Sequence, residues 1–530
     1  MQLLFGGTFI IHNFIKNFKY INMNSIKIKQ VLLLACITIC VSCKPKEEKV
    51  SSSQEKPNIL FLFADDQTFN TIGALKDCPV KTPNLDRLLE SGVSFSHAYN
   101  QGSFSPAVCI ASRTMLVTGG NLWKAASYSK KGNNLKDKNA PKSTSEYKVE
   151  FKRPEKYWPE FLKEAGYETY MSGKWHVGEV DPKTIFDHVA HIRPGMPNQT
   201  KQRYLRSFEK DKPDTWSPYD TINGGYWKGG KHWSEVLADD GVAFIEQAKN
   251  SKDPFFMYLA FNAPHDPRQA PKKFVDMYPA EDIKIPENFI PEYPYNKAAG
   301  AGRTLRDERL APFPRTEYSI QVNRQEYYAL ISHMDEQVGR ILKALEASGK
   351  ADNTYIFFTA DHGIAIGDHG FMGKQNMYES SMRVPLIVAG PNVPKGKTVD
   401  SFVYLQDVMA TTLEIAGVEK TEQVDFNSLL PLALGKTNKS AYQAVYGAYF
   451  GSQRMYRTEN YKMIVYPTIN MVRLYDIKND PLEMVDLAEN KEEHKALLNR
   501  LFKEYQTLQK EMDDPVDITE AFNNFMNTPS

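Results

Sequence analysis

The sequence predicts an α/β fold with a large, mostly parallel sheet. Three apolar runs, at residues 59–63, 255–259 and 355–358, are almost uninterrupted, and a weaker run spans 168–171. Such runs indicate strands that are buried on both faces, as in the parallel sheet of an α/β protein. Segments with helical spacing alternate with these strands, and this alternation supports the same fold class.

Two of the helices can be bounded from the sequence. The first is predicted to begin at Pro83 and to end before Gly92. The second is predicted over residues 323–347, because its apolar residues recur at helical spacing until Gly349. The C-terminal part differs: it predicts a small antiparallel sheet that carries a helix. Its strands are expected at 446–449, 455–457, 461–465 and 473–476, and its helix at about 490–511.

The composition is that of a globular protein. The chain has 530 residues, 65 basic against 64 acidic side chains, and 42% hydrophobic residues. This balance excludes a mostly disordered chain, and it shows no excess of basic residues that would indicate nucleic-acid binding. We predict a catalytic α/β domain over residues 57–435 and a C-terminal subdomain over 436–530.

The N-terminus is typical of an export signal. The apolar run 31–41 is too short to span a bilayer but suits a signal-peptide core, and it ends just before Cys43. We therefore predict a lipoprotein-type signal peptide over residues 1–43, with Met23 as an alternative start, and a flexible tether over 44–56. The protein would work in the periplasm or at the cell surface, anchored to the outer membrane by a lipid on Cys43. Ordinary cleavage without a lipid is the alternative.

Polar residues follow each of the predicted buried strands. In a parallel sheet the carboxyl ends of the strands meet at one edge, where ligands bind. These side chains are therefore expected to share one cleft: Asp65, Asp66, Lys174, His176, His265, Asp361 and His362.

Two acidic pairs in this set suggest a metal site. Burying Asp65 and Asp66 without a cation is costly, and carboxylate oxygens suit a hard ion such as Ca²⁺ or Mg²⁺. Asp361, His362 and Gln67 are further candidate ligands. The alternative is that each pair forms an ordinary solvated turn.

A cysteine is predicted at the start of a helix that runs from Cys109 to Gly119. The positive end of a helix favours an anion there, and Arg113 adds a cation one turn later. The alternatives are a buried structural cysteine or a disulfide with Cys78.

Cations and histidines complete the candidate site. Lys174 and His176 lie two residues apart, on one side of an extended segment, and Lys374 is a third candidate cation. A lysine and a histidine in one cleft can neutralise an oxyanion and move a proton. Singly, each lysine could be solvated and His265 could be structural. Together they favour an anionic ester, and the residues alone do not decide between phosphate and sulfate.

The segment Cys109-Ile110-Ala111-Ser112-Arg113 resembles the signature of type I sulfatases, in which the cysteine is oxidised to formylglycine. Ala111 stands where the usual motif has proline, and His362 is typical of iduronate-2-sulfatase-like members. Further family motifs follow in the expected order: Pro57-Asn58-Ile59-Leu60, Asp65-Asp66-Gln67, Thr82-Pro83-Asn84-Leu85-Asp86, Gly173-Lys174-Trp175-His176, Ala263-Pro264-His265, Thr359-Ala360-Asp361-His362-Gly363, Gly373-Lys374, Arg383-Val384-Pro385-Leu386 and Leu474-Tyr475-Asp476.

The resemblance implies the alkaline-phosphatase-like fold, a sheet sandwiched by helices, and the formylglycine chemistry of bacterial polysaccharide sulfatases. The implied ligands of a bound Ca²⁺ are Asp65, Asp66, Asp361, His362 and the modified Cys109. A hydroxyl of the hydrated aldehyde would attack sulfur. The other implied roles are sulfate binding by Lys174 and Lys374, protonation of the leaving oxygen by His265, deprotonation of the second hydroxyl by His176, and orientation of the aldehyde by Arg113.

The sequence therefore predicts a sulfuric ester hydrolase that acts on a sulfated polysaccharide or oligosaccharide and that needs a formylglycine-maturing enzyme as a partner. One alternative is a phosphonate or phosphate ester hydrolase of the same superfamily, and another is a non-catalytic lipoprotein that binds sulfated glycan. Two long loop-like insertions, 121–150 and 296–322, are candidates for specificity. We expect some arginines of the second insertion to contact an anionic sugar: Arg303, Arg306, Arg309 and Arg315.

Overall fold

The computed structural model describes residues 55–529 except 76–77, 131–134, 137–145, 148, 194, 196–200, 205, 207, 211, 213 and 223–224. The predicted signal peptide, the lipid anchor and nearly all of the tether lie outside the described residues. Among the described residues, no helix is both long and apolar enough to cross a membrane.

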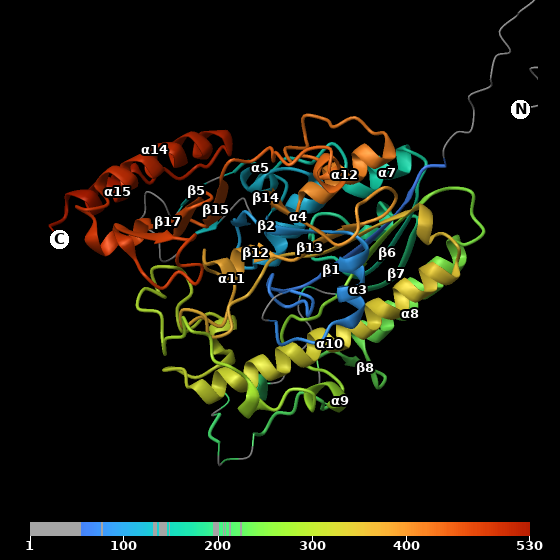
Figure 1. The fold of residues 1–530 in the computed structure, drawn as a ribbon, viewed down its shortest axis with the longest axis horizontal. Helices are drawn as coiled ribbons and strands as arrows, with labels where there is room; N and C mark the ends of the chain where they lie inside the picture. The colour runs from blue at the N-terminus through green and yellow to red at the C-terminus, as the bar shows by residue number, and fades with distance from the viewer. Residues whose placement is uncertain are drawn as a thin grey trace, which may run out of the picture. The chain divides into compact units, whose positions relative to one another are not determined.

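A nine-stranded sheet forms the centre of the larger part of the fold (Figure 1). Strand β1 (Asn58–Ala64) is fully buried and lies between β10 (Phe255–Ala260) and β11 (Thr354–Ala360), parallel to both. On the β10 side the sheet continues in parallel with β6 (Glu168–Lys174) and β7 (His188–Arg193). Its other side is mixed and contains β13 (Leu386–Ala389), β2 (Val93–Tyr99), β12 (Arg383–Val384) and β14 (Lys397–Tyr404).

Helices cover both faces of this sheet, as the alternation of side chains along each strand requires. On one face, Leu259 of β10 packs between α8 (Trp233–Ala248) and α10 (Glu317–Ala347), and α3 (Pro83–Ser91) packs beside α10. On the other face, Phe61 of β1 packs against Trp158 of α7 (Trp158–Glu164). Helices α4 (Val108–Thr118) and α12 (Asp407–Ala416) lie on that side as well. The predicted sandwich of helices around a mostly parallel sheet is confirmed.

The C-terminal part contains the predicted small sheet and its helix. Four antiparallel strands follow one another in the chain, and α14 (Lys495–Glu511) and α15 (Thr519–Asn527) lie beside them (Figure 1). The sequence did not predict a fifth strand, β3 (Gly102–Ser103), which pairs in parallel with the first of the four. The four strands are β15 (Val445–Tyr449), β16 (Gln453–Arg457), β17 (Tyr461–Tyr466) and β18 (Met471–Asp476).

Two segments differ in detail from the expectation. Helix α10 begins at Glu317, earlier than predicted, because Thr316 and Ser319 cap its first turn reciprocally. The insertion 296–322 therefore contains the start of a helix as well as a 3₁₀ turn at Asp307–Leu310. The remaining short elements are α5 (Leu122–Ser127), β4 (Leu135–Lys136), β5 (Glu146–Tyr147), β8 (Trp227–Lys228), β9 (Lys231–His232), α9 (Lys272–Val275), α11 (Glu379–Met382) and α13 (Leu430–Ala433).

Lys56–Ser530 group into one unit that contains both sheets. The boundary between residues 435 and 436 stays a prediction.

Candidate active site

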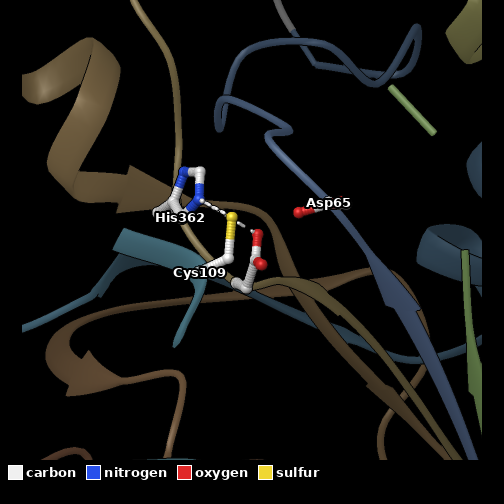
Figure 2. Close-up of side chains that lie close together, drawn as sticks. Asp65, Cys109 and His362 are labelled. Carbon is white, nitrogen blue, oxygen red and sulfur yellow. Dashed lines mark hydrogen bonds and ion pairs between the residues drawn. The ribbon is translucent and has the colours of Figure 1, made fainter. Parts of the chain in front are cut away.

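Two neighbouring strands and one helix bring the central residues together. Strands β1 and β11 run parallel in register up to Ala64 and Ala360, so Asp65 and Asp361 leave the sheet side by side. Cys109 is the second residue of α4 and is only 2% exposed. Figure 2 shows the imidazole of His362 directed at the sulfur of Cys109, with the Asp65 carboxylate facing the same space.

Cys109 lies at the centre of the polar contacts. Its Sγ atom is 3.3 Å from Nε2 of His362 and 3.9 Å from Oδ1 of Asp66. The Nζ atom of Lys374 lies 3.4 Å away and donates toward the sulfur. Burial would raise the pKa of the Cys109 thiol, but Lys174, Lys374 and His362 outweigh it and hold that pKa well below its ordinary value. The position is therefore built to stabilise negative charge.

Three buried carboxylates converge beside this sulfur. The backbone N–H of Asp66 donates to Asp361 at 3.1 Å, and burial with the nearby Asp361 raises the pKa of Asp65 well above normal. Burial also opposes ionisation of Asp66, but His265, Lys374 and His362 hold its pKa well below normal. Within the described residues, Oδ1 of Asp65 accepts no hydrogen bond. Nη2 of Arg113 lies 3.7 Å from this oxygen, beyond hydrogen-bond distance. A buried carboxylate oxygen without a hydrogen bond, among three carboxylates, indicates a cation site.

The potential ligand atoms form two overlapping groups, each with atoms within 4.8 Å of one another. One contains Asp65, Cys109, Asp361 and His362, and the other contains Asp66 and His265 together with Asp65 and Cys109. The five ligands that the sequence resemblance implies therefore lie together. The amide nitrogen of Gln67 donates to Thr71 at 3.1 Å, and its buried amide oxygen accepts no hydrogen bond within the described residues, so its role as a ligand stays a prediction.

The three cations contact these carboxylates directly. Nζ of Lys174 lies 2.5 Å from Oδ2 of Asp65, and Nζ of Lys374 lies 2.7 Å from Oδ1 of Asp66. Arg113 donates to Asp361 at 3.0 Å and to the carbonyl oxygen of Lys174 at 2.8 Å. Arg113 thus ties α4 to the ends of β11 and β6.

The two histidines approach from separate loops. Nε2 of His265 is 3.7 Å from Oδ2 of Asp66, while its Nδ1 lies 2.6 Å from the carbonyl oxygen of Asp266. His176 interacts electrostatically with Cys109, and burial lowers its pKa to about 4. Its backbone is left-handed, with φ +57°, rather than extended as the sequence suggested.

A glycine that the sequence did not single out packs on His176. A Cβ atom at Gly195 would lie 2.0 Å from Nε2 of His176. Asp266 was also missed, although its position directly after His265 could have indicated a partner for Nδ1. The contacts of Gly195 with His176 and of Asp266 with Arg306 form only in the folded chain, so the local sequence does not reveal them.

The structure shows which of the remaining sequence candidates lie near the site and which do not. Cys78 and Cys109 are both free thiols, so the alternative of a disulfide between them is excluded. Of the four arginines in the 296–322 insertion, Arg306 pairs with Asp266 at 2.9 Å, next to His265. Arg303 and Arg315 pair instead with Glu292 and Glu308, and Arg309 stacks on Tyr204.

Comparisons with known proteins identify the family of the chain. The model of the sulfatase family matches residues 57–418, and the C-terminal model of N-sulphoglucosamine sulphohydrolase matches residues 367–511. A sulfatase of Formosa agariphila is 29% identical over 88% of this chain and 89% of its own length.

Two solved structures share the fold. The first, a protein in complex with its substrate D-glucosamine-2-N,6-O-disulfate, has a TM-score of 0.67 at 23% identity and covers 88% of this chain and 100% of its own. The second, a phosphonate monoester hydrolase of Silicibacter pomeroyi, has a TM-score of 0.67 at 20% identity, with 86% and 95% covered. The family match spans most of the chain, and its motifs supply the buried residues around Cys109. The chain therefore belongs to the sulfatase family, the type I sulfatases of the alkaline phosphatase superfamily, and it is a sulfatase.

Proposed function

We propose that this sulfatase removes sulfate from a sulfated polysaccharide or oligosaccharide, with a formylglycine gem-diol made from Cys109 as the nucleophile and a bound calcium ion. The observation that supports this most is the position of Cys109, buried at a helix start between His362, Asp66 and Lys374. The substrate of the fold relative, a disulfated glucosamine, supports a sulfated sugar.

The donor set fits a calcium ion. Asp65, Asp66 and Asp361 offer hard oxygen atoms, and one oxygen of Asp65 has no hydrogen-bond partner among the described residues. The sulfur of Cys109 is a soft donor, and its conversion to a hydrated aldehyde would replace it with oxygen. His362 would add a nitrogen ligand. A bound ion would supply positive charge to the sulfate group and would make a hydroxyl at position 109 more nucleophilic.

The remaining side chains would bind the sulfate group and transfer protons. Lys174 and Lys374 would bind the sulfate oxygens, since both ammonium groups point to the carboxylates beside Cys109. His265 would donate a proton from Nε2 to the leaving oxygen, with Nδ1 held by the carbonyl of Asp266. His176, which interacts electrostatically with Cys109, would accept a proton from position 109. Arg113 would orient that group.

Peptide mass spectrometry of the fragment that contains Cys109 tests the proposal directly. The protein should come from its native host or be produced with a maturing enzyme. We expect an aldehyde in place of the thiol. An intact thiol in fully processed, active protein would contradict the proposed nucleophile.

The runner-up activity is hydrolysis of phosphonate or phosphate esters, favoured by the fold that this chain shares with a phosphonate monoester hydrolase. A phosphate monoester carries close to two negative charges near neutral pH, whereas a sulfate monoester carries one. Rates on 4-nitrophenyl sulfate and 4-nitrophenyl phosphate, measured on one preparation, decide between them. We expect the sulfate to have the higher kcat/KM.

We also propose export to the periplasm or cell surface, with a lipid on Cys43. The basis is the signal-like sequence 1–43, since those residues lie outside the described structure. Fractionation of cells that express the Cys43→Ala variant tests this. We expect the wild type in the membrane fraction and the variant in the soluble exported fraction.

A further inference from the structure

Buried donors without partners collect at the carboxyl ends of β10, β6 and β7, beside the candidate active site. In the part of the chain that the structure describes, Nη2 of Arg193, Nδ2 of Asn262 and Nε1 of Trp233 are buried and have no hydrogen-bond partner. All three side chains line one cleft that is too narrow for a water molecule, and only Arg193 of the three also lines the open cavity beside it. Leaving a buried guanidinium N–H unpaired is unfavourable, so Nη2 of Arg193 indicates a ligand that accepts a hydrogen bond from the side of that cavity.

Arg193 is the charged member of this group. It is the last residue of β7, it is 6% exposed, and its guanidinium stacks on Trp233 at 4.4 Å from the ring centroid. The nearby Asp240 is already engaged, because its carboxylate accepts from Ser172 at 2.6 Å and lies 2.9 Å from Nδ1 of His191. Among the described residues, no carboxylate forms an ion pair with Arg193. Its planar fork of N–H groups, fixed by the indole, suits a carboxylate or a sulfate.

The cleft adjoins open space next to the proposed catalytic residues. Arg193 also lines a cavity of about 190 Å³ whose walls include His176, Trp175 and Gly195. One water molecule takes about 30 Å³ of liquid volume, so this cavity has room for a whole anionic group.

The three donors flank the residues that would handle the scissile ester. Arg193 pairs in register with Lys174, and neighbouring strands lie only about 4.8 Å apart. The carbonyl oxygen of Asn262 accepts from the backbone N–H of His265 at 3.0 Å. A group bound at Arg193 would therefore lie close to a sulfate bound at Lys174, within reach of one sugar or of two linked sugars.

We propose that Arg193, held in place by the ring of Trp233, forms a subsite for a second anionic group of the substrate, a carboxylate or a sulfate other than the one that is hydrolysed. The inference rests on the proposed function and narrows it to sugars with at least two negative charges. The guanidinium of Arg193 selects an anion, and it does not distinguish a uronate carboxylate from a second sulfate.

The test compares substrates that differ in one charge. The probes are N-acetylglucosamine 6-O-sulfate, D-glucosamine-2-N,6-O-disulfate and a monosulfated disaccharide that contains a uronate, with 4-nitrophenyl sulfate as a reference. We expect the wild type to have a higher kcat/KM on a doubly charged sugar than on the singly charged one. For each doubly charged sugar we take the ratio of its kcat/KM to that of the singly charged sugar. The probe with the larger ratio identifies the second group as a sulfate or a carboxylate.

The variant Arg193→Gln should lower that ratio by roughly ten- to a hundred-fold, as expected when a charged hydrogen bond is lost. Arg193→Lys keeps the positive charge but lacks the planar pair of N–H donors, so it should lower the ratio less than Arg193→Gln does. This second variant also keeps the proposal testable if Arg193→Gln does not fold. The matched control is Arg87→Gln, which changes an exposed arginine paired with Glu346 on the surface and should leave the ratio unchanged.

Three results overturn the subsite, and the first two are equal kcat/KM on singly and doubly charged sugars and a ratio that Arg193→Gln does not change. Turnover of 4-nitrophenyl sulfate without turnover of any doubly charged sugar also overturns it, while the sulfatase chemistry still stands. Loss of turnover on 4-nitrophenyl sulfate itself in fully matured wild type would count against the proposed function instead.

Discussion

The backbone of Gly195 packs so closely on the ring of His176 that a Cβ atom at position 195 would lie 2.0 Å from Nε2 and 2.2 Å from Cδ2. The glycine therefore fixes where the imidazole lies relative to Cys109. We predict that Gly195→Ala lowers kcat on 4-nitrophenyl sulfate about 100-fold, since a displacement of about 1 Å can have that effect. KM should change much less, because the lysines that bind sulfate stay in place.

Two controls separate this effect from general damage to the loop. Gly178→Ala adds a methyl group near the same cavity, where nothing lies within 4 Å, and should leave kcat unchanged. In a His176→Ala background, Gly195→Ala should have no further effect, because the clashing ring is gone. A full additional loss in the double variant would show that Gly195 does not act through His176.

Cys109→Ser provides a direct test of the second hydroxyl that the proposed chemistry needs. A serine alcohol can take up the sulfate group but cannot expel it in the same way, since it has one hydroxyl only. We expect at most a single turnover and a sulfated protein in intact mass spectrometry. Repeated turnover by the serine variant, made without any maturing activity, would contradict the gem-diol nucleophile.

Metal removal should lower both activity and stability. Asp65, Asp66 and Asp361 repel one another when buried, and a bound cation relieves that repulsion. Chelation should therefore lower Tm and abolish activity, and Ca²⁺ at 100 times its Kd should restore about 2.7 kcal/mol of stability. The variant Asp361→Asn should lose most of the Ca²⁺-induced rise in Tm in differential scanning fluorimetry. An equal rise in wild type and variant would place the ion elsewhere.

A buried carboxylate pair near the small sheet should make stability depend on pH. Glu379 and Glu483 share Lys462, at 2.8 and 2.6 Å, and burial raises the pKa of Glu483 from 4.5 to about 7. The folded state therefore binds an extra proton between pH 4.5 and 7 that the unfolded chain lacks. Its contribution to the free energy of unfolding is complete below pH 4.5 and falls by about 3 kcal/mol as the pH rises through 7.

The variant Glu483→Gln should remove this dependence. Urea unfolding at pH 5 and pH 8 should show a smaller loss of stability for the variant than for wild type. Glu414→Gln, which changes an exposed residue of α12, should behave like wild type. Parallel losses in wild type and Glu483→Gln would mean that Glu483 ionises normally in the folded protein.

The main features of the fold follow from local sequence pattern. Uninterrupted apolar runs predicted β1, β10 and β11, because a strand covered on both faces needs apolar side chains at every position. Strand β3 was missed because it has only two residues and exists through its distant partner. Gly102 has φ +92°, and a Cβ atom there would lie 2.0 Å from the carbonyl oxygen of Ala448. No local pattern at residues 102–103 indicates that contact.

Residues that follow strand ends could be collected into one candidate site, since parallel strands deliver them to the same edge. Asp65 and Asp361 are examples. The left-handed backbone of His176, the close approach of Gly195 and the unpaired guanidinium of Arg193 all depend on what packs against them from elsewhere in the chain. The sequence therefore indicated the chemistry of the centre better than the geometry that orients it.

The pairing of β3 with β15 also bears on the time course of synthesis. The segment that leads into Cys109 cannot complete its sheet until Ala448 has left the ribosome, about 350 residues after Gly102, which at 5–20 residues per second takes roughly 20–70 s. In the folded protein Cys109 is only 2% exposed. The proposed oxidation of this cysteine therefore requires a chain that has not yet completed this sheet and still presents residues 105–119 as an accessible peptide.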